Sequence, residues 1–322
     1  MIRYETKVKI LSASLAGLVL LLVLGAVFSP ERRLARGESG RLLSGEAKAA
    51  ARIEFTGPAG SLNLEKDDKG AWKLHEADGE LPAASARIEG FLGQLAAVAR
   101  LSPLAEGKAA WESLGLEEGK GTRVRVRDSA GKTVADFVAG SYGATGKVLA
   151  VRLGEAEKVY AADGAIGSYV GAGRASWLEL RVLEAALSPE DVQGLAMRAK
   201  LFLDGAGRPG KVFDWRAGRD QGGWTAGAQA LDSLAVETLI RGILNLEGED
   251  AHAAIPAEAF GPVALRVEIA LGTGQTLVYE VGAPAAEGRY FLRRAGGGPV
   301  FEVSAYALRN LAKSLPELAA KK

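Results

Sequence analysis

Histidine is the first place to look for acid–base or metal chemistry, and this chain has only two, His75 and His252. No cysteine is present to form a thiolate metal site or to act as a nucleophile. A serine triad needs a histidine partner, and the nearest serines, Ser141 and Ser168, lack the G-x-S-x-G frame of a nucleophile elbow. We therefore interpret both histidines as surface or loop residues and predict no catalytic residue.

Carboxylates would have to supply any metal site in this chain. The acidic run EKDDKG at 65–70 is one candidate, but it lacks the D-x-D-x-D-G spacing of a calcium loop, and a charged turn explains it as well. Three glycine-rich stretches, at 171–176, 205–210 and 296–298, resemble phosphate loops at first sight. None follows a strand and opens a helix, as the dinucleotide fingerprint requires. We predict no metal site and no cofactor.

Tryptophans and arginines are the remaining candidates for binding. Trp72 and Trp224 each lie on an expected strand just before a helix, where either core packing or a stacking platform for sugar is possible. The repetition favours core packing. The run RVRVRD at 123–128 places arginines on one face of a strand. That face is either a solvated surface opposite a valine core or an interaction face for an acidic partner.

Length and charge limit the class of protein. The chain has 322 residues, enough for two domains. Lysine and arginine total 40 while aspartate and glutamate total 39. A nucleic-acid-binding protein usually carries a basic excess, so this balance argues against that class.

The N-terminal segment has the pattern of a membrane helix. Residues 10–28 carry no charge, and their number is close to the ~20 that cross the hydrocarbon core of a bilayer. We predict a cytoplasmic tail at 1–9, a transmembrane helix at 10–29 and a charged, glycine-rich tether at 30–47. A cleaved signal peptide is the alternative.

The remainder of the chain repeats one order of short strands and helices. The repeat pairs Trp72 with Trp224 and Gly140 with Gly282, and likewise Gly115 with Gly261 and Tyr160 with Phe301. A tandem duplication explains this pattern best. The predicted fold class is therefore α+β: after the transmembrane helix come two repeated α+β modules with mostly antiparallel sheets, at 48–185 and 186–322.

The layout resembles a bacterial family, domain of unknown function 4340. The resemblance rests on GAWKL, SLGLEEG, TVADFVAGSYG, KVLAVRLGEAEKVYAAD and WLELRVL, in that order within 51–185. One departure is visible, because the family's proline before the main helix is present as Pro82 but has no counterpart in the second repeat. The resemblance implies a single-span membrane protein with its modules outside the membrane, encoded near ABC-type transport systems, sometimes of the gliding-motility kind. It implies no catalytic residue.

These observations together predict a non-catalytic accessory or scaffold protein rather than an enzyme. It would be anchored in the bacterial inner membrane by a single pass, with an extracytoplasmic body and ABC-type transporter subunits as partners. Two alternatives stay open. One is an envelope hydrolase acting on glycan through a carboxylate pair, and the other is a ligand-binding module that uses a groove between the two modules.

Overall fold

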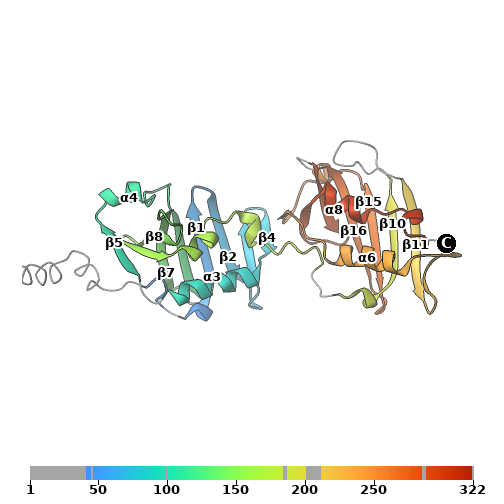
Figure 1. The fold of residues 1–322 in the computed structure, drawn as a ribbon, viewed down its shortest axis with the longest axis horizontal. Coiled ribbons are helices and arrows are strands. Elements are labelled where there is room, and N and C mark those ends of the chain that lie inside the picture. Colours follow the sequence, from blue (N-terminus) through green and yellow to red (C-terminus); the bar gives the residue numbers. More distant parts are fainter. Residues whose placement is uncertain are drawn as a thin grey trace, which may run out of the picture. The chain divides into compact units, whose positions relative to one another are not determined.

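The computed structural model describes residues 41–44, 46–98, 101–183, 187–200, 212–284 and 288–320. These residues form two antiparallel sheets of nine strands each (Figure 1). The strand orders are β4-β3-β2-β1-β6-β7-β8-β9-β5 and β13-β12-β11-β10-β15-β16-β17-β18-β14. Because the second order repeats the first position for position, each strand of one sheet has a counterpart in the other.

The first sheet and its helices follow one another in this order: η1 (Ala47–Ala49), β1 (Ala50–Gly57), β2 (Gly60–Lys66), β3 (Trp72–Glu76), β4 (Gly79–Pro82), α3 (Ser85–Ala97), β5 (Ser102–Glu106), α4 (Ala109–Ser113), β6 (Thr122–Asp128), β7 (Thr133–Tyr142), β8 (Val148–Leu153), β9 (Lys158–Asp163), η2 (Gly164–Ile166), α5 (Gly167–Val170) and η3 (Arg174–Trp177).

The second sheet repeats this order: η4 (Pro189–Asp191), β10 (Val192–Ala199), β11 (Phe213–Asp220), β12 (Gly223–Ala226), β13 (Gln229–Ala230), α6 (Ser233–Leu244), β14 (Asp250–His252), α7 (Ala257–Phe260), β15 (Leu265–Leu271), β16 (Thr276–Pro284), β17 (Arg289–Arg294), β18 (Val300–Ser304), α8 (Ala305–Leu311) and η6 (Leu315–Glu317).

One long helix covers one face of each sheet, α3 in the first and α6 in the second (Figure 1). Their buried side chains recur every three or four positions, as an amphipathic helix on a core requires. They are Ile88, Phe91, Leu92 and Leu95 in α3, and Val236, Leu239, Ile240, Ile243 and Leu244 in α6. Burying each large apolar side chain contributes about 1.5–3 kcal/mol, so these stripes fix each helix on its sheet.

The residues paired by the sequence repeat occupy equivalent places. Trp72 begins β3 and Trp224 lies in β12, and both are buried. Gly115 and Gly261 have φ angles of +64° and +66°, in the left-handed region that glycine adopts without strain. Each of these glycines ends the turn after a short helix, so the duplicated sequence produces the same backbone reversal twice.

Contacts between residues divide the chain into two compact units. One holds the described residues up to Asn63 together with Ala86–Ala172, and the other holds Leu64–Ser85 together with Gly173–Lys322. This division assigns the hairpin of β3 and β4 to the second unit, although β3 lies beside β2 in the first sheet. The predicted module boundary at 185 lies among residues 184–186, which are outside the described part.

The predicted fold class needs correction. The described chain is dominated by antiparallel sheet rather than by a balance of helix and strand, because each sheet of nine strands carries one helix of about three turns and otherwise only short helices. Among the described residues, no helix is long and apolar enough to cross a membrane. The transmembrane helix predicted at 10–29, the tail at 1–9 and the tether up to residue 40 lie outside the described residues.

Candidate functional site

The strands of the second sheet direct alternate side chains to its two faces. In β15, Leu265, Val267 and Ile269 are buried beneath the helices, whereas Arg266 and Glu268 point the other way. The same alternation holds in the neighbouring strands. We call the face opposite α6 the second outer face; its charged members include Arg198, Asp214, Arg216, Arg266, Glu268, Glu280 and Arg293.

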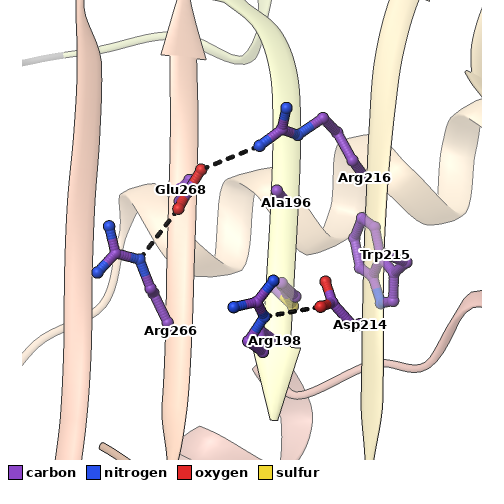
Figure 2. Close-up of a pocket in the computed structure, with 8 residues that line it drawn as sticks. Ala196, Arg198, Asp214, Trp215, Arg216, Arg266 and Glu268 are labelled. Atoms are coloured by element: carbon purple, nitrogen blue, oxygen red, sulfur yellow. Dashed lines mark hydrogen bonds and ion pairs between the residues drawn. The ribbon is translucent and has the colours of Figure 1, made fainter.

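Figure 2 shows the ion pairs that cross the strands of the second outer face. Arg198 on β10 donates to Asp214 on β11 at 2.7 Å, and Arg266 donates to Glu268 at 3.0 Å. Arg216 on β11 reaches Glu268 at 3.5 Å, and its side chain is 81% exposed. These residues line a shallow hollow of about 620 Å³ over β10, β11 and β15. Arginines outnumber carboxylates there by three to two.

Glu280 anchors the other side of this face. It lies on β16 directly opposite Arg266, which donates to it at 3.1 Å. Arg293 on β17 donates to the second carboxylate oxygen, also at 3.1 Å, and places its guanidinium 3.9 Å from the centre of the Phe260 ring. Only 13% of the Glu280 side chain is exposed, so this pairing is well protected from solvent.

The first sheet carries a similar ladder on the corresponding face, which we call the first outer face. Arg123 on β6 donates to both carboxylate oxygens of Asp136 on β7, at 2.9 and 2.8 Å, and to Glu155 at 2.7 Å. Arg127 lies 3.7 Å from Glu54 on β1. Arginine ladders therefore occur on both copies, as the run RVRVRD suggested for the first.

The electrostatics of the first outer face favour the ionised carboxylates. Burial by itself would raise the pKa of Asp136, but the hydrogen bonds and positive charge of Arg123, aided by Arg125, hold it below its usual range. The same hydrogen bonds raise the pKa of Arg123 further above its already high value. Hydrogen bonding and charge from Arg123 also lower the pKa of Glu155.

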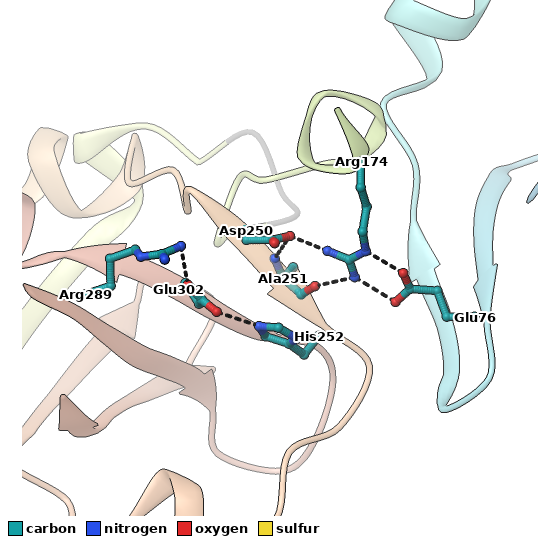
Figure 3. Close-up of polar contacts among 7 residues, drawn as sticks. All are labelled: Glu76, Arg174, Asp250, Ala251, His252, Arg289 and Glu302. Carbon is teal, nitrogen blue, oxygen red and sulfur yellow. Dashed lines mark hydrogen bonds and ion pairs between the residues drawn. The ribbon is translucent and has the colours of Figure 1, made fainter. Parts of the chain in front are cut away.

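A second polar cluster surrounds Arg174, which lies at the start of η3 (Figure 3). Its guanidinium pairs with both oxygens of Glu76 on β3, with Asp250 on β14, and at 2.8 Å with the carbonyl oxygen of Ala251. Hydrogen bonds from Arg174 lower the pKa of Glu76, and those carboxylates raise the pKa of Arg174. Arg174 therefore ties the β3–β4 hairpin to strand β14.

His252 belongs to an adjoining cluster in the same view (Figure 3). Its Nε2 lies 2.8 Å from Glu302 on β18, and Arg289 pairs with the other oxygen of Glu302 at 2.6 Å. The imidazole also meets the ring of Phe291 edge-on, with centroids 6.0 Å apart. His252 is thus partly buried and paired, which differs from the predicted surface or loop residue.

The other residues considered in the sequence have structural positions. His75 lies on β3, 3.3 Å from Glu80 on β4. In the acidic run at 65–70, Asp67 accepts hydrogen bonds from the backbone of Lys69 and Ala71 and thereby closes the turn between β2 and β3. Within the described residues, no group of three or more histidine or acidic side chains is placed to hold a metal ion.

The three glycine-rich stretches occupy different positions in the chain. Residues 296–298 form the turn between β17 and β18, residues 171–176 contain Arg174, and residues 205–210 lie outside the described part. Trp72 and Trp224 are 4% and 2% exposed. A side chain so deeply buried cannot serve as a stacking surface, so both tryptophans pack the core.

Sequence reasoning missed Arg174 and Glu280. Arg174 lies in GAGRAS, where an isolated arginine in a glycine-rich loop was the only available signal. Glu280 interrupts the apolar pattern of β16, and its counterpart Val138 in the first copy is apolar. A charged residue at a position that is apolar in the other repeat was a signal that internal alignment could have found.

Chemically, the two clusters offer guanidinium groups paired with carboxylates. A guanidinium presents planar, paired N–H donors that match carboxylate or phosphate oxygens. The exposed pairs of the second outer face contribute only about 0–1 kcal/mol each to stability, because solvent screens them. An incoming anion can therefore replace an internal partner at small cost, which makes this face the best candidate for a binding site.

Comparison with known proteins gives one match. Residues 72–253 match the family model described as "Domain of unknown function (DUF4340)". No curated protein and no solved structure matches the chain. The matched segment covers more than half of the chain and spans parts of both copies, so this chain belongs to the DUF4340 family of domains of unknown function.

Proposed function

We propose that the protein is a non-catalytic accessory or scaffold protein of a bacterial transport or envelope machine. Its body lies on the extracytoplasmic side of the inner membrane, and its partners include subunits of an ABC-type transporter. The observation that supports this proposal is the second outer face, where arginines and carboxylates form a ladder across β10, β11, β15, β16 and β17.

The exposure of these arginines favours recognition of another molecule. Arg198 and Asp214 are 58% and 61% exposed, and Arg216 is 81% exposed. Such pairs add little to stability, so folding alone does not explain an arrangement of this extent. Arginine is also among the residues enriched where proteins bind one another.

The excess of arginine over carboxylate in the hollow defines the partner's chemistry. An acidic, extended segment of a transporter subunit would place carboxylates against Arg198 and Arg216 while leaving the Glu280 pairing intact. Charge pairs at an interface rim act mainly on the association rate and are weakened by salt. Binding is therefore expected to fall as ionic strength rises.

Copurification from membranes solubilised in mild detergent tests this function. The tagged full chain should recover ABC-type transporter subunits, identified by mass spectrometry, and less of them at higher salt. The double variant Arg198→Glu/Arg216→Glu should reduce that recovery about tenfold or more. The matched control is Arg309→Glu, which reverses an exposed arginine on α8 and should leave recovery unchanged.

Two results would overturn the proposal. The first is recovery of the protein alone across several mild detergents. The second is equal recovery of transporter subunits by the double variant and by the Arg309→Glu control, because the second outer face would then have no part in binding. Fractionation of the same cells checks the location, since the full chain should sediment with inner membranes.

A further inference from the structure

An open groove lies on the helical side of the second sheet, away from the second outer face. It runs between α6 and the segment from α8 to η6, and its volume is about 770 Å³. Leu239, Leu311 and Leu318 supply buried apolar surface. Leu234 stands at the rim with 74% of its surface exposed.

The first copy shows what the corresponding place contains when it is filled. Backbone hydrogen bonds align the copies: Ala83 and Leu231 donate to the tryptophan carbonyls of Trp72 and Trp224. In the same way, Ala84 donates to the carbonyl of Trp177 and Asp232 to that of Leu318. This alignment matches Arg87 with Ala235, Gly90 with Thr238, Phe91 with Leu239 and Tyr169 with Asn310.

In the first copy, an aromatic ring occupies this place. Tyr169 on α5 packs against Phe91 of α3, with ring centroids 5.5 Å apart. A Cβ at Gly90 would lie 3.0 Å from the Tyr169 hydroxyl, so the ring sits directly on the helix backbone. Arg87 covers the ring at 5.1 Å and donates at 3.1 Å to the carbonyl of Ser168.

The second copy lacks each of these components. Asn310 stands where Tyr169 would be, and Ala235 stands where Arg87 would cover the ring. Both of these smaller residues line the open groove. We propose that this groove binds an aromatic side chain from a partner polypeptide, which takes the place that Tyr169 occupies in the first copy.

The shape and chemistry of the groove agree with this occupant. Apolar surface from Leu239, Leu311 and Leu318 favours a flat ring, and a groove of this volume lies in the range of about 300–1,000 Å³ in which proteins hold ligands. Aromatic anchors in such pockets commonly dominate the energy of protein–protein binding. Asp232, Lys313 and Glu317 add polar groups to the lining of the groove.

A peptide copied from the first module tests the proposal. The probe is a synthetic nonapeptide with the sequence of residues 165–173, AIGSYVGAG, and its control carries alanine in place of the tyrosine. Binding is followed by methyl NMR of the leucines in the full chain. The tyrosine peptide should shift the Leu234, Leu311 and Leu318 signals saturably, and the alanine peptide should bind at least about tenfold more weakly.

Variants separate the groove from other surfaces. The double change Thr238→Gly/Asn310→Tyr rebuilds the first copy's ring and should abolish peptide binding. Leu234→Glu, at an exposed position that folding does not depend on, should weaken it about tenfold or more. Arg198→Glu/Arg216→Glu should bind the peptide normally, so the outcome is independent of the function proposed for the second outer face.

Three results of the peptide experiments would overturn this inference. They are equal shifts with the tyrosine and alanine peptides, undiminished binding by the Leu234→Glu variant, and no shift of the groove leucines at saturating peptide. A dependence of the Leu234 signals on protein concentration without peptide would instead identify a second copy of the chain as the occupant, and the proposal of a foreign aromatic side chain would be wrong.

Discussion

At the scale of single residues, Gly140 and Gly282 show why both copies of the repeat have glycine at the same position. A Cβ at Gly140 would overlap the carbonyl oxygen of Leu114, and one at Gly282 would overlap that of Phe260. Neither glycine has a positive φ, so the reason for glycine is space and not backbone conformation. In each copy, the strand passes directly under the loop that follows the short helix.

We predict that Gly282→Ala destabilises the protein by roughly 1–3 kcal/mol, because the new methyl group must displace the Phe260 backbone. Urea unfolding of the variant measures this loss. Gly218→Ala in the same sheet is the matched control, since a Cβ added there would meet no atom within 4 Å. Equal stability of the two variants would contradict the steric explanation.

The carboxylate of Asp136 should make stability depend on pH. Its pKa is lowered in the folded protein, so its contribution is complete above the unfolded value of about 3.9 and is lost as the pH falls through the folded value. Asp136→Asn should therefore cost roughly 1–2 kcal/mol at pH 7 and progressively less below about pH 4.

Urea unfolding at pH 7 and at pH 3 measures the effect of this substitution. Asp214→Asn serves as the control, because its ion pair with Arg198 is mostly exposed and its removal should change stability little at either pH. A constant penalty for Asp136→Asn across this range would show that the lost contact is not the ionised one.

At the scale of elements, strands with regular alternation were predictable and interrupted ones were not. β6 occupies Thr122–Asp128, the span that its alternating arginines and valines indicated. β10 occupies Val192–Ala199, where a register shift between Val192 and Gly194 breaks the period of two. A bulge hides a strand from pattern analysis, since it moves side chains to the opposite face.

Candidate binding residues could likewise be predicted only where the sequence pattern is local and regular. The arginines of β6 could be recognised from local spacing, whereas the Arg174 cluster joins residues distant in sequence, Glu76 and Asp250. The stacking of Arg152 on Trp111 and of Arg293 on Phe260 was not predictable from local spacing either. Arg152 and Arg293 occupy equivalent positions in the two sheets. The rings that they cover lie at different positions of the short helices α4 and α7, so the two copies share no sequence motif for this contact.

We expect Arg174→Gln to loosen β14. The glutamine loses the paired contacts to Glu76 and Asp250 and the bond to the Ala251 carbonyl. Hydrogen exchange of the β14 amides should accelerate about tenfold, equivalent to ~1.4 kcal/mol of local stability. Arg198→Gln, which breaks an exposed pair elsewhere in the same sheet, should leave β14 unchanged; identical exchange in both variants would contradict this role for Arg174.

At the scale of the whole molecule, each sheet has a core of its own. Phe137 on β7 and its counterpart Tyr279 on β16 are both buried against the helical side of their own sheets. The duplication therefore repeats a complete packing unit, which is why the order of elements in one copy predicted that of the other. The second outer face, which we propose as the binding face, could not be predicted in this way, because the copies diverge there.

We predict that core damage stays within one sheet. Phe137→Ala should cost about 3–5 kcal/mol and increase hydrogen exchange in β6–β9, with little change in β15–β18. Tyr279→Ala should produce the reverse pattern. Native-state hydrogen exchange read by mass spectrometry distinguishes these outcomes, and a uniform loss of protection in either variant would show instead that the two sheets unfold as one.

The bond from Arg174 to the Ala251 carbonyl has a consequence for the behaviour of concentrated protein. β14 is the last strand of the second sheet, and an open sheet edge is a template on which strands of other molecules can add. By occupying that carbonyl with a charged side chain, Arg174 blocks a site where aggregation could begin. We therefore expect loss of this arginine to make neighbouring molecules join edge to edge more readily.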